Sequence, residues 1–74
     1  MLRLPWRKVR DQNRLQFRVG GWLGCVEWWE GGQDGNWALY RDGELMANDI
    51  AATVALGQIA VEDVYMGWFS RILE

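Results

Sequence analysis

The sequence predicts an α+β domain: an antiparallel sheet of three to four strands with one or two C-terminal helices packed on one face. Three observations lead to this fold class. Apolar and polar residues alternate strictly from Arg14 to Val19, and an Asp-Gly pair at 42–43 separates two apolar-rich runs. After Asn48 the spacing of apolar residues changes from about two to about 3.7, which is close to the helical period.

The chain forms a single small domain with a basic N-terminal arm or edge strand (1–13), a β-meander (14–47) and a mostly helical segment (48–74). Pro5 excludes a helix interior from the arm and favours an extended chain before it. The arm is therefore either an edge strand or a segment packed over the core by Leu2, Leu4 and Trp6. The polar residues 11–13 predict the turn that follows it.

The meander begins with the strand 14–19, in which Leu15, Phe17 and Val19 point inward and the outer face is cationic. Gly20-Gly21 forms either a tight hairpin turn or a bulge. The next strand, 22–29, turns its wholly apolar or small face inward, namely Trp22, Gly24, Val26 and Trp28.

Asp42-Gly43 gives the strongest local signal, because this pair favours the two-residue hairpin turn that needs positive φ. We therefore expect 37–41 to pair with 44–47. Asn48-Asp49 predicts a helix start, and Gly57 disfavours one long helix. Two helices, 49–57 and 61–73, are favoured, with a terminal strand at 64–73 as the alternative.

The chain lacks the residues on which most catalytic mechanisms depend. The chain has no histidine and one cysteine, which removes the commonest general base and a Cys/His zinc site within one chain. Besides two tyrosines, its side-chain hydroxyls are Thr53 and Ser70, neither with a base at motif spacing. We expect Cys25 to be a small buried hydrophobe. The sequence therefore predicts a protein that is not an enzyme and that has no catalytic residues, metal ligands or cofactor.

Charge is divided unevenly along the chain, although the net charge is only −2. Residues 1–20 carry six Lys or Arg against one Asp, and residues 21–74 carry two Arg against nine carboxylates. Such asymmetry concerns partners and association rate rather than fold. A lone cysteine and the lack of a secretory segment favour the cytoplasm, that of a host cell if the protein is viral. No uncharged apolar run approaches the roughly 18 residues of a membrane span.

The tryptophan content and the acidic remainder predict binding to another protein. Six tryptophans are too many for so small a core, and Trp is enriched in interface hot spots. A small acidic domain can occupy a basic, nucleic-acid-binding surface of a partner, which is the physical logic of phage-encoded inhibitors of host defence such as anti-CRISPR proteins. The candidate protein-binding residues are Glu27, Trp29, Glu30, Asp34 and Trp6, with both tryptophans expected to be exposed.

Nucleic-acid binding is the alternative function. Arginines beside a stacking aromatic suit phosphates and single-stranded bases. The candidate residues are Arg7, Lys8, Arg10, Arg14 and Arg18. A structural homo-oligomer subunit, including a homodimer, is the lesser alternative, and a membrane partner is not expected.

Overall fold

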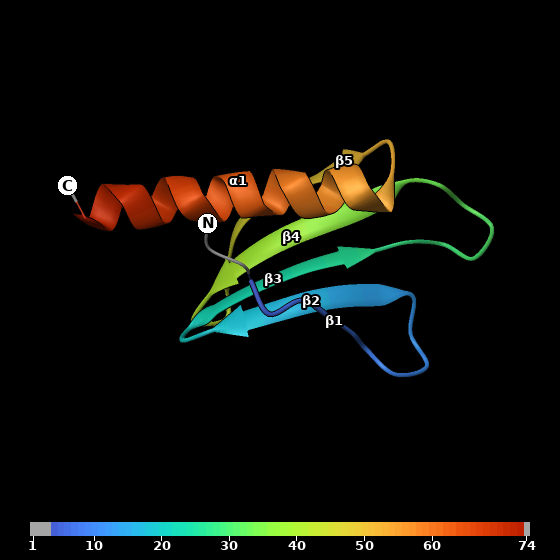
Figure 1. Cartoon of the computed structure of the whole chain (residues 1–74), viewed down its shortest axis with the longest axis horizontal. Coiled ribbons are helices and arrows are strands. Elements are labelled where there is room, and N and C mark those ends of the chain that lie inside the picture. Colours follow the sequence, from blue (N-terminus) through green and yellow to red (C-terminus); the bar gives the residue numbers. More distant parts are fainter. Residues whose placement is uncertain (1–3, 74) are drawn as a thin grey trace.

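Within the residues that the structure describes, the fold is a five-stranded antiparallel meander followed by one helix (Figure 1). The computed structural model describes residues 4–73, and side chains as far as Trp68. The elements in order are β1 (Arg7–Lys8), β2 (Arg14–Val19), β3 (Trp22–Glu27), β4 (Gly35–Arg41), β5 (Glu44–Ala51) and α1 (Val54–Leu73). The α+β class is confirmed, and the sheet over the described residues has five strands where three to four were predicted.

The predicted Asp-Gly hairpin is present, and of the two alternatives at Gly20-Gly21 the structure has the hairpin turn. Gly20 has a φ of 57°, and a tight turn rather than a bulge connects β2 to β3, with Val19 paired with Trp22. Asp42 and Gly43 have φ values of 50° and 84°, as the two-residue turn with positive φ requires. The β4–β5 register follows from this turn, because Arg41 is the partner of Glu44.

The N-terminal arm combines the two predicted arrangements. Arg7 and Lys8 pair with β2 as a short edge strand, while Leu4 and Trp6 pack against the core. Leu2, the third residue expected to pack there, lies outside the described residues. The turn predicted at 11–13 is present, with Asp11 at a φ of 60°.

The predicted helix at 49–57 is wrong, because β5 continues to Ala51. Gly35 is opposite Ala51 and Asn36 is opposite Ile50, so the backbone groups at the start of β4 find their partners in the strand. The helix begins later, where the Leu56 N–H donates to Thr53 Oγ1 at 3.1 Å. Thr53, and not the Asn-Asp pair, is therefore the N-cap.

The predicted break at Gly57 and the alternative terminal strand are also wrong, since α1 runs without interruption from Val54 to Leu73. Gly57 has a packing role instead. A Cβ at this position would lie 3.0 Å from Val26 Cγ1 and 3.5 Å from the Gly35 carbonyl oxygen. The glycine lets the helix lie close against β3 and β4.

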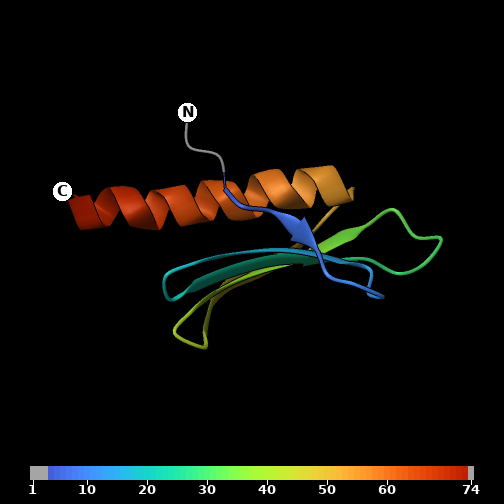
Figure 2. The same cartoon turned by 60° about the horizontal axis from the view of Figure 1, so that its bottom comes forward.

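The core lies between α1 and one face of the sheet (Figure 2). Its fully buried side chains are Phe17, Val26, Leu39 and Val61, and Tyr65 is nearly so. The rings of Phe17 and Tyr65 meet edge to face with their centroids 5.3 Å apart. Aromatic side chains also surround this core, since Trp6, Trp22, Trp37 and Trp68 are partly buried against it.

Candidate binding surfaces

The strand registers divide the sheet into a face covered by α1 and an opposite face, here called the open face. Cross-strand partners point to the same side of a sheet, so one buried residue assigns a whole row. Phe17, Gly24 and Leu39 form a row on the covered face. The open face consists of three rows: Arg14–Glu27–Asn36–Ile50, Arg7–Gln16–Cys25–Ala38–Asn48 and Arg18–Leu23–Tyr40–Leu45.

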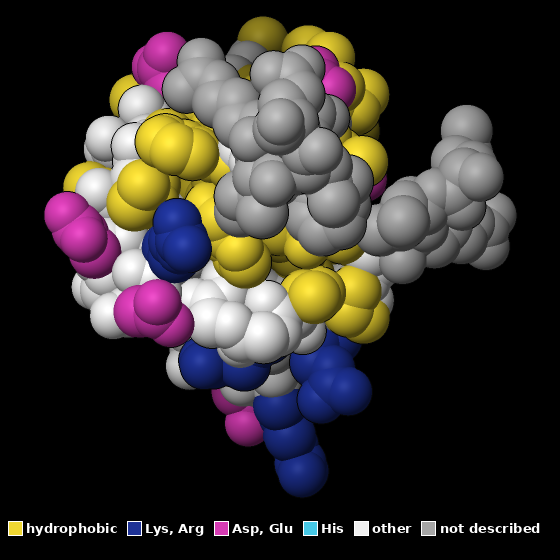
Figure 3. All heavy atoms as spheres, turned by 90° about the vertical axis from the view of Figure 1, so that its left-hand side faces the viewer, with side chains coloured by type: hydrophobic (Ala, Val, Ile, Leu, Met, Phe, Trp, Pro, Cys, Tyr) yellow, Lys and Arg dark blue, Asp and Glu magenta, His cyan; other side chains and the backbone are white. Residues whose placement is uncertain are grey.

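Three of the predicted nucleic-acid-binding residues come together on the open face. Arg7 is opposite Gln16, and Arg14 and Arg18 lie two residues to either side of Gln16 on β2. Both are therefore diagonal neighbours of Arg7, at roughly 7–8 Å between backbones. We call Arg7, Arg14 and Arg18 the arginine cluster. Figure 3 shows Lys and Arg side chains gathered toward the β1–β2 side of the molecule.

The three cations of the arginine cluster have different surroundings. Arg14 is mostly buried, and its guanidinium donates to Glu27 Oε1 at 2.9 Å and to Gln16 Oε1 at 3.1 Å. In the described part of the chain, Arg7 and Arg18 form no ion pair. The positive charge that the cluster presents to solvent is therefore mainly that of Arg7 and Arg18.

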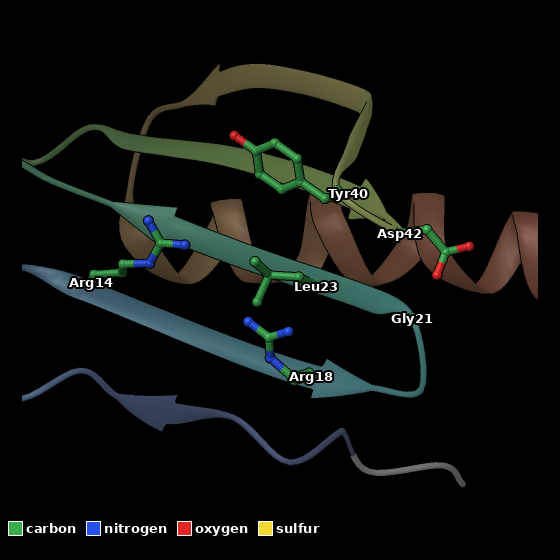
Figure 4. A pocket seen from close by; sticks show the side chains of 7 residues that line it. Arg14, Arg18, Gly21, Leu23, Tyr40 and Asp42 are labelled. Atoms are coloured by element: carbon green, nitrogen blue, oxygen red, sulfur yellow. The ribbon is translucent and has the colours of Figure 1, made fainter.

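Two shallow hollows lie beside this cluster and share Arg18. One has a volume of about 420 Å³ and is lined by Arg14, Arg18, Gly21, Leu23, Tyr40, Asp42 and Gly43 (Figure 4). The other, of about 280 Å³, is lined by Pro5, Arg7, Gln16 and Arg18. The open face is thus hollowed on both sides of one unpaired guanidinium.

The other two predicted nucleic-acid-binding residues lie elsewhere. Lys8 is opposite Leu15, in the row of Val26 on the covered face. Arg10 belongs to the turn after β1, where its side chain is 96% exposed and 4.0 Å from the Asp11 carboxylate. The structure therefore does not bring the five basic residues together as one patch.

Four of the five predicted protein-binding residues lie in or beside the connection between β3 and β4. We call residues 28–34 the Trp29 loop; it projects past the start of α1 in Figure 1. Trp29 is 78% exposed, so the predicted exposure of this side chain is confirmed. Glu30 and Asp34 are exposed in the same loop, and Glu27 is exposed at its base.

The Trp29 loop has internal order and a small hollow. The Gly32 N–H donates to the Trp29 carbonyl oxygen at 2.8 Å, and Gly31 supplies the positive φ of 81° for this turn. A hollow of about 190 Å³ is lined by Glu27, Trp28, Trp29 and Asn36. An indole, three carboxylates and this hollow thus share one end of the sheet.

Trp6 does not have the exposure that was predicted. Its side chain is half-buried, and its ring centroid lies 5.0 Å from that of Phe17. Pro5 and the pairing of Arg7 with Gln16 direct the arm so that Trp6 covers the edge of the core. Its Nε1 is buried and has no hydrogen-bond partner among the described residues.

Cys25 is buried, as predicted, although it belongs to the open-face row. Burial raises the pKa of the Cys25 thiol above its ordinary value of 9.0, and the lowering by the Arg14 charge is a smaller effect. A protonated, buried thiol is a poor nucleophile. Among the residues the structure describes, no group of three or more His, Cys, Asp or Glu could hold a metal ion.

Sequence reasoning placed Gln16 on the outer face of its strand and Leu23 on the face away from the core, but it named neither residue, nor Tyr40, as a binding residue. Alternation along β4 places Tyr40 on the other side of the sheet from the buried Leu39. Joining these residues into one surface required the strand registers.

No protein-family model matches this chain, and no curated protein and no solved structure is similar enough to it to count as a match. Within residues 4–73, no helix is long and apolar enough to cross a membrane. The two exposed surfaces themselves, the Trp29 loop and the open face, are what indicate a function.

Proposed function

We propose that the protein is a small, non-catalytic binding protein that docks through the Trp29 loop onto a basic, nucleic-acid-binding surface of a partner protein and occludes it. This is the mode of action of phage-type inhibitors such as anti-CRISPR proteins. The observation that carries the proposal is the 78% exposure of Trp29 between exposed carboxylates.

An exposed indole costs solubility and contributes nothing to the core, so a binding role gives it a purpose. Trp side chains are enriched among the few residues that dominate interface energetics. In the same loop, the exposed carboxylates of Glu30 and Asp34 would attract a positively charged partner and reject a negatively charged one, while Glu27 at the base is paired with Arg14. An apolar anchor beside exposed carboxylates therefore suits a basic surface that has an apolar pocket.

The experiment uses immobilised protein to capture partners from the heparin-retained fraction of a bacterial lysate, because that fraction is enriched in proteins with basic, nucleic-acid-binding surfaces. The expected result is one retained protein that is lost with Trp29→Ala and with the charge reversal Glu30→Lys/Asp34→Lys. The captured protein should also lose binding to its nucleic acid when the small protein is added.

Matched controls come from the helix. Ile59 is an apolar side chain that is 54% exposed, so Ile59→Ala removes exposed apolar area elsewhere. Asp63→Lys reverses an exposed carboxylate on α1. Both controls should capture the partner normally. Equal loss with the controls, or a captured protein that still binds nucleic acid in the complex, would contradict the proposal.

A further inference from the structure

We infer that the open face is a second, separate binding site, which takes single-stranded nucleic acid, with phosphates on Arg7 and Arg18 and a base against Tyr40. This site goes beyond the proposed function, because it lies on the sheet and not on the Trp29 loop.

The first observation is electrostatic. Arg7 is a diagonal neighbour of both Arg14 and Arg18 across Gln16, so three positive charges lie close together on one face. Glu27 relieves only Arg14. An anion that bridges Arg7 and Arg18 would remove the remaining repulsion, and a phosphate matches the fork of a guanidinium. The cluster is thus arranged for anions although the whole chain is acidic.

The second observation is the row of Arg18, Leu23 and Tyr40. Figure 4 shows these side chains on the same side of the sheet, with Leu23 between the guanidinium and the phenol ring. Arg18 and Tyr40 are two strands apart, which is about 9–10 Å. Bases stack on aromatic side chains of open sheets without sequence preference, while arginines hold the backbone.

The shape of the surface favours a single strand over a duplex. The two hollows beside the arginine cluster share Arg18 and are lined by residues of neighbouring strands. Bases inside a duplex present no free ring face to Tyr40, whereas bases of a single strand do. The amide group of Asn48 on the same face can hydrogen-bond a base edge.

The test measures binding of a fluorescent 12-nucleotide oligothymidine by anisotropy at 50 and 200 mM salt. With two phosphate contacts, on Arg7 and Arg18, the affinity should fall by about sevenfold between the two salts, because the slope for single strands is about −0.7 per contact. Arg7→Gln/Arg18→Gln should weaken binding at 50 mM at least tenfold and remove most of the salt effect. Tyr40→Leu should weaken binding about tenfold at an unchanged salt slope.

The control is Lys8→Gln/Arg10→Gln, which removes the same charge from the covered face and from a turn and should change the affinity less than twofold. Three results would overturn the inference: no saturable binding at 50 mM salt, equal loss in the control, or a duplex bound as tightly as the single strand. A change of oligomeric state in Arg7→Gln/Arg18→Gln, measured by light scattering, would instead assign this face to a homodimer and also overturn it. Thermal unfolding by circular dichroism confirms that each variant is folded.

Discussion

The two faces of the sheet differ in how their arginines and aromatic rings are used. On the covered face, Arg41 lies 5.4 Å above the ring of Trp22, and Trp22 in turn meets Tyr65 edge to face. On the open face, Arg18 and Tyr40 line a hollow of about 420 Å³. One set of residue types therefore stabilises the fold, and the same types across the sheet are left available for a ligand.

The largest effect should separate the faces directly. Phe17→Ala removes a fully buried ring from the covered face and should cost about 3–5 kcal/mol, enough to unfold so small a domain. Leu23→Ala on the open face should cost about 1 kcal/mol, because this side chain is only half-buried. Urea unfolding followed by circular dichroism measures both. Equal losses would show that the open face is part of the core.

Glycines test the close packing of the covered face. A Cβ on Gly24 would lie 2.4 Å from Phe17 Cε2, so Gly24→Ala should destabilise the fold by about 1–3 kcal/mol. Gly67 lies on α1, and a Cβ added there would have no atom within 4 Å. Gly67→Ala should therefore stabilise the helix by up to about 1 kcal/mol. Gly57→Ala should fall between them, because its helical gain is offset by contact with Val26. A Gly24→Ala variant as stable as the natural chain would refute the packing described.

Cys25 sharpens the comparison because it is buried on the open face. Its pKa is raised by burial, so the folded state holds the proton more tightly than the unfolded state does. The stability that this difference in pKa contributes is fully present below pH 9.0, which is the ordinary pKa of the thiol. It is lost as the pH rises through the higher pKa of the folded state. Urea midpoints from pH 8 to 10.5 should fall more steeply for the natural chain than for Cys25→Ala. Parallel curves would contradict the burial of this thiol.

The smallest effect has an unusual sign. Arg7→Gln should raise stability slightly, by at most about 0.5 kcal/mol, because it removes repulsion from Arg14 and Arg18. Arg10→Gln, in the turn after β1, should not raise the stability. The urea midpoints should be compared at 20 mM and 500 mM salt, since screening removes the difference at the higher salt. A loss of stability in Arg7→Gln at low salt would mean that the cluster is compensated within the fold.

Local signals were enough for the meander and insufficient for its end. Alternation at 14–19 and the turn residues Gly20-Gly21 and Asp42-Gly43 fixed strands and register, because short-range sterics decide hairpins. Asn48 to Ala51 carried helix-like spacing, yet pairing with β4 outweighed it. Gly57 was interpreted as a break when its role is a tertiary contact with Val26. Contacts between elements distant in the sequence decided both cases, and such contacts cannot be seen in a single sequence.

The candidate site was predictable in the same partial way. Exposure of Trp29 was predicted from its place on the outer face of the expected strand 22–29, although β3 ends at Glu27 and Trp29 lies in the loop. Burial of Trp6 depended on how the arm folds back onto Phe17. The basic residues were identified by type, but their division among the open face, the covered face and a turn came from the β1–β2 register.

An NMR titration of the labelled protein with the 12-nucleotide oligothymidine distinguishes the two surfaces most directly. We expect shifts confined to the open face, at Arg7, Gln16, Arg18, Leu23 and Tyr40, with the Trp29 indole N–H and the amides of α1 unmoved. Shifts that instead centre on the Trp29 loop or on α1, or a spectrum that does not change at all, would contradict the division of the molecule into a covered face that holds the fold and an open face that binds.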